Sequence, residues 1–71
     1  MTLADLPNES RGQIKDLAGD PTLVARLREL GFIRGEEVRI AGRAPFGEPI
    51  LIEIRGSTVA LRTREAQCVQ M

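Results

Sequence analysis

A chain of 71 residues has room for one domain with a small core, so a single domain over residues 1–71 is expected. Trp and Tyr are absent and only Phe32 and Phe46 are aromatic, which argues against a surface that stacks on nucleic-acid bases. Ten basic and ten acidic residues cancel, so no net charge attracts the protein to nucleic acid or to an anionic membrane.

Residues 1–17 predict short elements only. Leu3 and Leu6 stand three apart before Pro7, a spacing that predicts one helical turn packing both leucines onto the core. Residues 8–11 are polar and form a surface connection. Residues 12–17 predict a weak strand, with Ile14 and Leu17 as its apolar members and an alternation that breaks between them.

The clearest local signal is a helix from Pro21 to Leu30. Asp20 is a good N-cap acceptor for the first free amides, and Pro21 suits the first helical position, where its missing N–H costs nothing. Gly31 suits the residue after the helix, which often has a positive φ. The apolar residues at helical spacing form the stripe that should face the core: Leu23, Val24, Leu27 and Leu30.

The residues after the helix predict a tight turn and a strand. Phe32 should fold back onto the last helical turn, and residues 33–36 predict a type II turn with Gly35 at its third position. A strand over residues 37–44 follows. On the outer face of the helix, Arg26 and Glu29 are spaced for an i,i+3 ion pair.

The C-terminal half predicts a loop and a hairpin. Two prolines and a glycine make residues 44–49 a loop, whose Phe46 either plugs the end of the core, the favoured interpretation, or is an exposed contact. Residues 50–55 alternate cleanly as a strand, Gly56 and Ser57 form the turn, and residues 58–62 return with Val59 and Leu61 inward.

The order of these elements predicts a mostly β fold. Residues 63–66 form a short crossing of about one helical turn, and residues 67–71 form a final strand. A helix followed by short strands with tight turns indicates a small, strongly bent antiparallel sheet closed on itself, with the helix over one open end. Edge strands in small sheets often pair between copies, so a homo-oligomer is an open alternative.

The residue types present exclude most catalytic chemistry. Histidine is absent, which removes imidazole metal ligation and His-dependent catalysis. Cys68 is alone, so it is expected to be a small core residue in a reducing compartment. No glycine motif forms a phosphate loop. We therefore expect no enzyme, no catalytic residue, no cofactor and no metal, and, without an apolar span or leader, a cytoplasmic protein.

The same composition limits the classes of molecule that the protein is expected to bind. Nucleic acid is not expected, because glutamates are interleaved with the five arginines that would have to share one face of the sheet: Arg39, Arg43, Arg55, Arg62 and Arg64. A protein partner remains. The surface for it would combine the outer face of the helix with the loop around Phe46.

Three segments carry a resemblance to a known family: RLRELGFIRGEEV at residues 26–38, APFGEPI at 44–50 and GSTVALRTREAQCV at 56–69. In this order and spacing they resemble the ferrous iron transport protein A (FeoA) family. The resemblance implies an SH3-like β-barrel with one inserted helix at about residues 21–30. It also implies a cytoplasmic accessory protein that binds the permease FeoB, through its G-protein domain, and reaches the membrane only through that permease.

The resemblance leaves the contact surface open. The residues expected to touch the partner lie around the helix end and on the long loop: Arg26, Arg28, Arg34, Pro45 and Phe46. The resemblance also implies an alternative function, because the same domain occurs as the C-terminal part of iron-dependent repressors. A detached, metal-responsive regulatory module of that kind would use carboxylates such as Glu36, Glu37 and Glu48.

Overall fold

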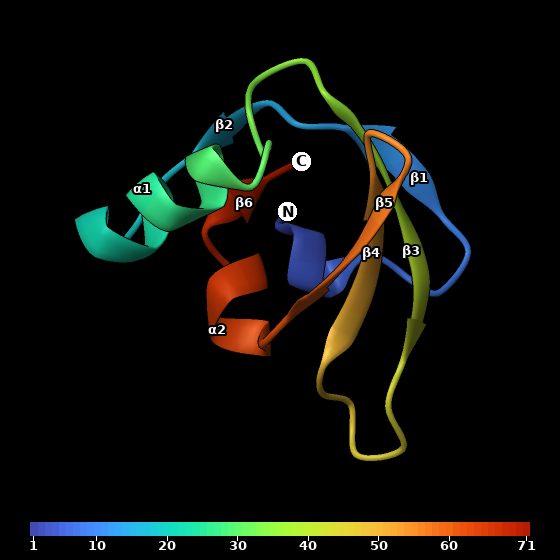
Figure 1. Cartoon of the computed structure of the whole chain (residues 1–71). Helices are drawn as coiled ribbons and strands as arrows, with labels where there is room; N and C mark the ends of the chain where they lie inside the picture. Colours follow the sequence, from blue (N-terminus) through green and yellow to red (C-terminus); the bar gives the residue numbers. More distant parts are fainter.

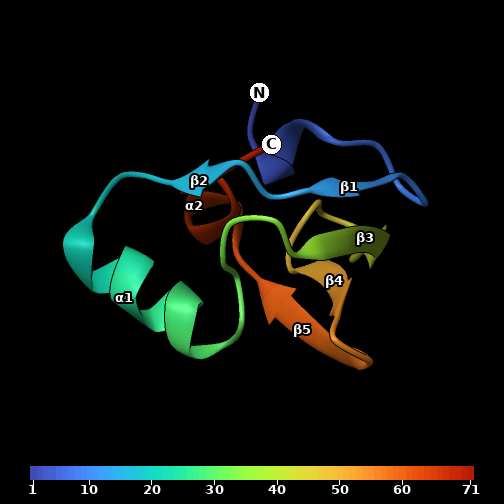
Figure 2. The same cartoon turned by 90° about the horizontal axis from the view of Figure 1, so that it is seen from above.

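The computed structural model describes all residues, 1–71, and builds two antiparallel sheets around one core (Figures 1 and 2). The larger sheet has the order β1-β3-β4-β5 and the smaller pairs β2 with β6. The strands are β1 (Arg11–Gln13), β2 (Asp16–Leu17), β3 (Glu37–Arg43), β4 (Ile50–Ile54), β5 (Ser57–Leu61) and β6 (Val69–Gln70). The helices are η1 (Leu3–Asp5), a single 3-10 turn, α1 (Pro21–Glu29) and α2 (Thr63–Ala66).

The single bent sheet expected from the sequence is thus divided between two sheets. The division falls inside the weak strand predicted for residues 12–17, where the chain changes partner. The N–H of Ile14 donates to the carbonyl of Glu36 (3.0 Å), beside β3, whereas the N–H of Lys15 donates to Gln70 in β6 (2.8 Å). Two short strands form because their hydrogen-bond partners lie in different parts of the molecule.

The helix follows its predicted bounds closely. Asp20 Oδ1 accepts from the N–H of Thr22 (2.8 Å), and Leu30 is the C-cap. Gly31 has φ 106°. The N–H of Gly31 donates to the carbonyl of Arg28 and that of Phe32 to Leu27, both at 3.0 Å. This pair of bonds is a Schellman motif, so the helix end is closed as the glycine predicted.

The apolar stripe of α1 is narrower than predicted. Val24 and Leu27 are buried and Leu23 packs partly against the core, but Leu30 is 45% exposed. The Schellman turn brings Phe32 back beneath the helix end, where it is fully buried and occupies the place expected for Leu30. The predicted Arg26–Glu29 pair is also wrong, because Arg26 instead lies 3.9 Å from the carboxylate of Glu65.

The turn after α1 forms as predicted. Gly35 has φ 87°, and the N–H of Glu36 donates to the carbonyl of Ile33 (3.1 Å). The hairpin between β4 and β5 differs by one residue from its prediction. Its two loop residues are Arg55 and Gly56, with φ 52° and 79°, which define a type I′ turn.

A β-bulge interrupts the pairing of β3 with β4. Ile40 pairs with Ile52 and Gly42 with Leu51, so Ala41 has no partner. Side chains alternate between the two faces of a strand, and one inserted residue exchanges the faces for everything beyond it. Arg39 therefore lies on the outer face of the sheet, whereas Arg43, opposite the buried Ile50, lies on the inner face.

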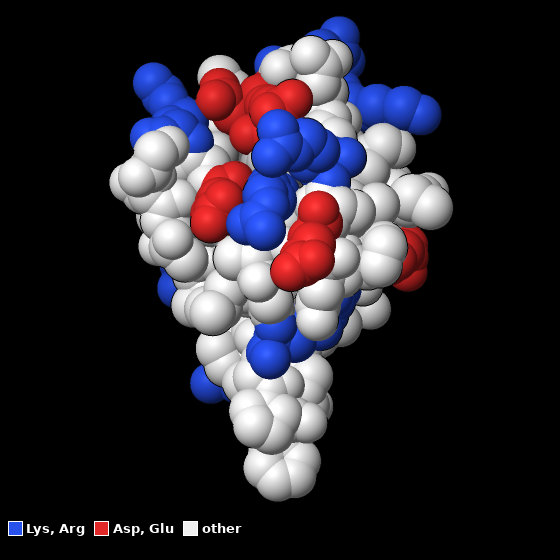
Figure 3. Space-filling view, turned by 90° about the vertical axis from the view of Figure 1, so that its right-hand side faces the viewer, with Lys and Arg blue, Asp and Glu red and all other residues white.

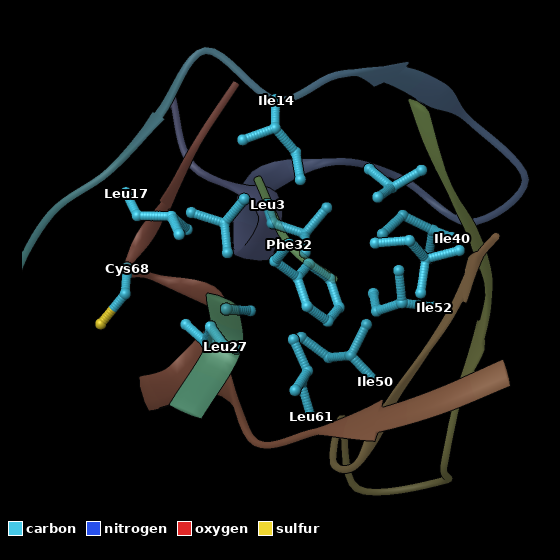
Figure 4. Close-up of a cluster of buried hydrophobic side chains, with 14 of the residues drawn as sticks. Leu3, Ile14, Leu17, Leu27, Phe32, Ile40, Ile50, Ile52, Leu61 and Cys68 are labelled. Atoms are coloured by element: carbon cyan, nitrogen blue, oxygen red, sulfur yellow. The ribbon is translucent and has the colours of Figure 1, made fainter. Parts of the chain in front are cut away.

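Fifteen buried residues form one hydrophobic core between the two sheets (Figure 4). Phe32 lies among the isoleucines of β3 and β4 and is fully buried. Cys68 is also buried, as expected for a small core residue. The two ends of the chain meet beside this core, where the N–H of Met71 donates to the carbonyl of Met1 (3.0 Å). No helix combines the length and apolar character that a membrane crossing needs.

Candidate interaction surface

The loop between β3 and β4 carries the most exposed large apolar side chain of the protein. Phe46 is 99% exposed, so the prediction that it plugs the core is wrong. Ile50, the first residue of β4, is already buried in the core, and the loop that carries Phe46 projects beyond the ends of β3 and β4 (Figure 1). The loop is held at its base, because the N–H of Ala44 donates to the carbonyl of Pro49 (3.1 Å) and that of Gly47 to Ala44 (2.8 Å).

Apolar residues surround Phe46 on this projection. Pro45 and Pro49 are exposed in the same loop, and Leu51 follows on the outer face of β4, 37% exposed. In Figure 3 the lowest part of the molecule is the projecting β3–β4 loop, and its end shows no charged side chain. We call residues 45–49 the loop tip. Folding does not require an exposed phenylalanine, whereas apolar patches of this kind mark binding sites.

A second exposed cluster lies where α1 ends. Leu30 and Ile33 are 45% and 44% exposed, on either side of the buried Phe32. Arg34 follows in the turn, where its Nε donates to the carbonyl of Lys15 (3.1 Å) and its guanidinium lies 3.8 Å from Asp16. These contacts hold the Arg34 side chain against Lys15 and the first residue of β2 while leaving most of it in solvent.

The helix-end surface is defined by five residues: Arg26, Arg28, Leu30, Ile33 and Arg34. Arg26 and Arg28 lie in the last turn of α1 and are exposed. Sequence reasoning missed Leu30, which was assigned to the core, and Ile33. The exposure of Ile33 could have been inferred from its position. It is the first residue of the predicted turn, so it belongs neither to the apolar stripe of the helix nor to the alternating pattern of the strand.

The five predicted contact residues fall on two separate surfaces. Pro45 and Phe46 belong to the loop tip, in the loop between β3 and β4 at the lower end of the molecule in Figure 1. Arg26, Arg28 and Arg34 belong to the helix-end surface, in the upper part of the same view. A partner that touches both surfaces must therefore reach around the molecule, whereas a small contact uses one of them.

The outer face of the larger sheet carries interleaved charges (Figure 3). Arg39 lies 3.1 Å from Glu53 on the neighbouring strand, and Arg11 lies 3.9 Å from Glu37. The charged ends of these strands and the β4–β5 turn line an open groove of about 370 Å³. The arginine stripe considered from the sequence does not form, because the bulge places Arg43 on the opposite face from Arg39.

The carboxylates of the alternative metal site lie apart. Glu37 begins β3 and is paired with Arg11, whereas Glu48 lies in the loop beyond the other end of the same strand. No three Asp, Glu or Cys side chains are placed to hold a metal ion together. One carboxyl group has a shifted pKa: the backbone N–H of Thr2 donates to Asp5 (2.8 Å) and lowers the pKa of Asp5. This contact caps η1 at the N-terminus.

Comparison with solved structures finds similar folds. FeoA from Stenotrophomonas maltophilia, solved with zinc, is 38% identical, with a TM-score of 0.85 over 97% of this chain and 86% of that chain. It is described as a prokaryotic SH3 domain protein and a candidate activating factor of bacterial ferrous iron transport. Iron(II) transport protein A from Clostridium thermocellum is 36% identical, with a TM-score of 0.91 over 99% of this chain and 43% of that chain.

The fold also extends to regulators. A manganese-dependent transcriptional repressor is 21% identical, with a TM-score of 0.86 over 97% of this chain and 39% of that chain, and it shares the fold alone. A search of curated proteins finds no match. A model of the FeoA domain matches residues 1–71. These matches confirm the SH3-like fold and the resemblance seen in the sequence. The chain belongs to the FeoA domain family, which is linked to ferrous iron transport.

Proposed function

We propose that this protein is a non-enzymatic accessory factor of ferrous iron uptake. It works in the cytoplasm and binds the G-protein domain of the ferrous iron permease FeoB. Membership of the FeoA domain family over residues 1–71 supplies the link to iron transport. The observation that supports action by contact is the 99% exposure of Phe46 on a projecting loop.

The loop tip has the properties of a binding anchor. Burying a phenylalanine side chain against a partner stabilises a complex by about 1.5–3 kcal/mol, and aromatic anchors commonly dominate binding energy. Pro45 and Pro49 restrict the backbone on both sides of Phe46, so less conformational entropy is lost when the loop docks. The loop tip should therefore lose little conformational entropy when it binds a partner.

The helix-end surface is the second part of the proposed contact. Its exposed apolar residues, Leu30 and Ile33, lie between Arg26 and Arg34 along the chain, which suits an acidic or mixed partner surface. Exposed charges at the rim of an interface speed association more than they strengthen binding. We therefore expect Arg34→Ala to lower the association rate and its salt dependence.

The test is binding of the full chain to the isolated G-protein domain of the permease from the same source, measured by calorimetry with GDP and with a non-hydrolysable GTP analogue. Phe46→Ala should weaken binding by at least about tenfold, the equivalent of 1.4 kcal/mol. Phe46→Leu, which keeps an apolar side chain, should lose less. Gln13→Ala, an exposed change on β1, is the matched control and should bind as the wild type does.

Two results would contradict the proposal at different levels. If the wild-type chain binds in neither nucleotide state, contact with the G-protein domain is wrong. If it binds and Phe46→Ala binds equally well, the partner is right and the loop tip is not the contact. Circular dichroism of each variant confirms that the fold is retained.

A further inference from the structure

The strand β5 has a free edge. It pairs with β4 on one side and is the last strand of the larger sheet. No backbone hydrogen bond outside the β4 pairing involves residues 57–61, and no side chain bonds to their backbone. The N–H and C=O groups that point away from β4 therefore have no partner within the chain, and they form a template for another strand.

The opposite edge of the sheet is protected and β5 is not. At β1, Arg11 is paired with Glu37, and the Met71 side chain lies so close to Gly12 that a Cβ there would meet it at 3.3 Å. β5 reads Ser-Thr-Val-Ala-Leu, with no charge and no proline. Edge strands of monomeric sheets usually carry such charges or prolines to prevent pairing.

The inner face of the sheet is incomplete at the same place. Ile40, Ile52 and Val59 lie side by side on β3, β4 and β5. Ile40 and Ile52 are fully buried, whereas Val59 is only half-buried. Val59 packs against the core but keeps part of its surface in solvent, and a further strand beside β5 would bury more of it.

We propose that β5 pairs with β5 of a second copy, antiparallel, about a two-fold axis at Val59. In this register the two Val59 side chains meet, and Thr58 faces Ala60 of the other copy on the outer face of the sheet. The flanking charges do not clash, because Arg62 falls opposite Gly56 of the other copy. No position of the strand opposes a like charge in this register, which favours a second copy over an unrelated peptide.

The proposal does not depend on the proposed function and uses neither the loop tip nor the helix-end surface. The resulting dimer has one continuous sheet running through both copies. Five residue pairs make a small interface, so the association should be weak and concentration-dependent rather than permanent. The dimer would be populated at high local concentration.

Two double variants that differ only at residue 60 test the register. In the monomer, Thr58 faces Glu53 and Ala60 faces the uncharged Leu51, so both sites are exposed and tolerate charge. T58K/A60K places like charges opposite each other across the two-fold axis. T58K/A60E places opposite charges there. Phe46→Ala is the control for association through the loop tip.

The measurement is sedimentation equilibrium of the full chain from about 10 μM to about 1 mM. We expect the wild type and Phe46→Ala to self-associate, T58K/A60K to weaken association by at least about tenfold, and T58K/A60E to stay within a few-fold of the wild type. A wild type that is monomeric throughout, or equal association of the two double variants, would overturn the proposal.

Discussion

Arg43 ties the N-terminal segment to the larger sheet, and its removal should destabilise the fold. Its Nη1 donates to Asn8 Oδ1 (2.7 Å), and its Nη2 donates to the carbonyls of Leu6 (2.7 Å) and Ala4 (3.2 Å). The side chain is half-buried. These three bonds join η1 and the residues that follow it to the end of β3, two parts of the chain that share no sheet pairing.

The expected loss of folding free energy follows from the number of these bonds and from their exposure to water. A hydrogen bond from a charged donor contributes about 1.5–3 kcal/mol when buried, but at a half-exposed site water replaces part of it, leaving roughly 0.5–1 kcal/mol each. Arg43→Met, which keeps the aliphatic stem, should therefore cost about 2 kcal/mol, or roughly 8–16 °C in Tm for a domain of this size. Arg43→Lys should recover less than half of this, because one ammonium group cannot reproduce the guanidinium fork.

Urea denaturation, monitored by circular dichroism, measures the loss of stability of both Arg43→Met and Arg43→Lys. A double-mutant cycle with Asn8→Ala isolates one of the three bonds, with an expected coupling of roughly 0.5–1 kcal/mol. The reasoning is refuted if Arg43→Met changes the free energy of unfolding by less than about 0.5 kcal/mol. It is also refuted if Asn8→Ala costs the same with and without Arg43.

Two further predictions concern the helix end and the N-terminus. Gly31→Ala should cost about 1–2 kcal/mol of backbone strain at φ 106°, plus a contact with Arg55, whose Cδ would lie 3.1 Å from the new Cβ. Gly35→Ala, with a positive φ and nothing within 4 Å, is the matched control for strain alone, and urea denaturation of both variants measures the difference. At the N-terminus, the bond from Thr2 lowers the pKa of Asp5 in the folded state, so Asp5 stabilises the protein above its unfolded-state pKa and loses that contribution as the pH falls through the folded value. The stability difference between wild type and Asp5→Ala should therefore disappear in acid, and an NMR titration of Asp5 that shows no lowered pKa would contradict this.

Local signals in the sequence predicted the elements that depend on few residues. Asp20, Pro21 and Gly31 set both ends of the helix, and the strict alternation of β4 was confirmed by its burial pattern. These features depend on backbone geometry and on hydrogen bonds between near neighbours. They are therefore readable without knowing the rest of the fold.

The errors arose where distant parts of the chain meet. Ala41 gives no signal for a bulge, yet the bulge turns Arg43 inward and removes the arginine stripe. Leu30 has the spacing of a core residue, but Phe32 occupies that place through the turn. Phe46 was assigned to the core because the number of inward residues at that end cannot be counted from sequence. The contact residues themselves stay predictions, since family membership names the process and not the surface.

The meeting of the two chain ends has a practical consequence. Met1 and Met71 are hydrogen-bonded to each other, so both ends leave the protein at one place, away from the loop tip in Figure 1. A surface-immobilised or fluorescently tagged protein would present the same side outward whichever end is attached. A short peptide joining the ends would make a circular protein without disturbing the fold. Closing the ring lowers the conformational entropy of the unfolded chain, which would stabilise the folded protein by roughly 4 kcal/mol.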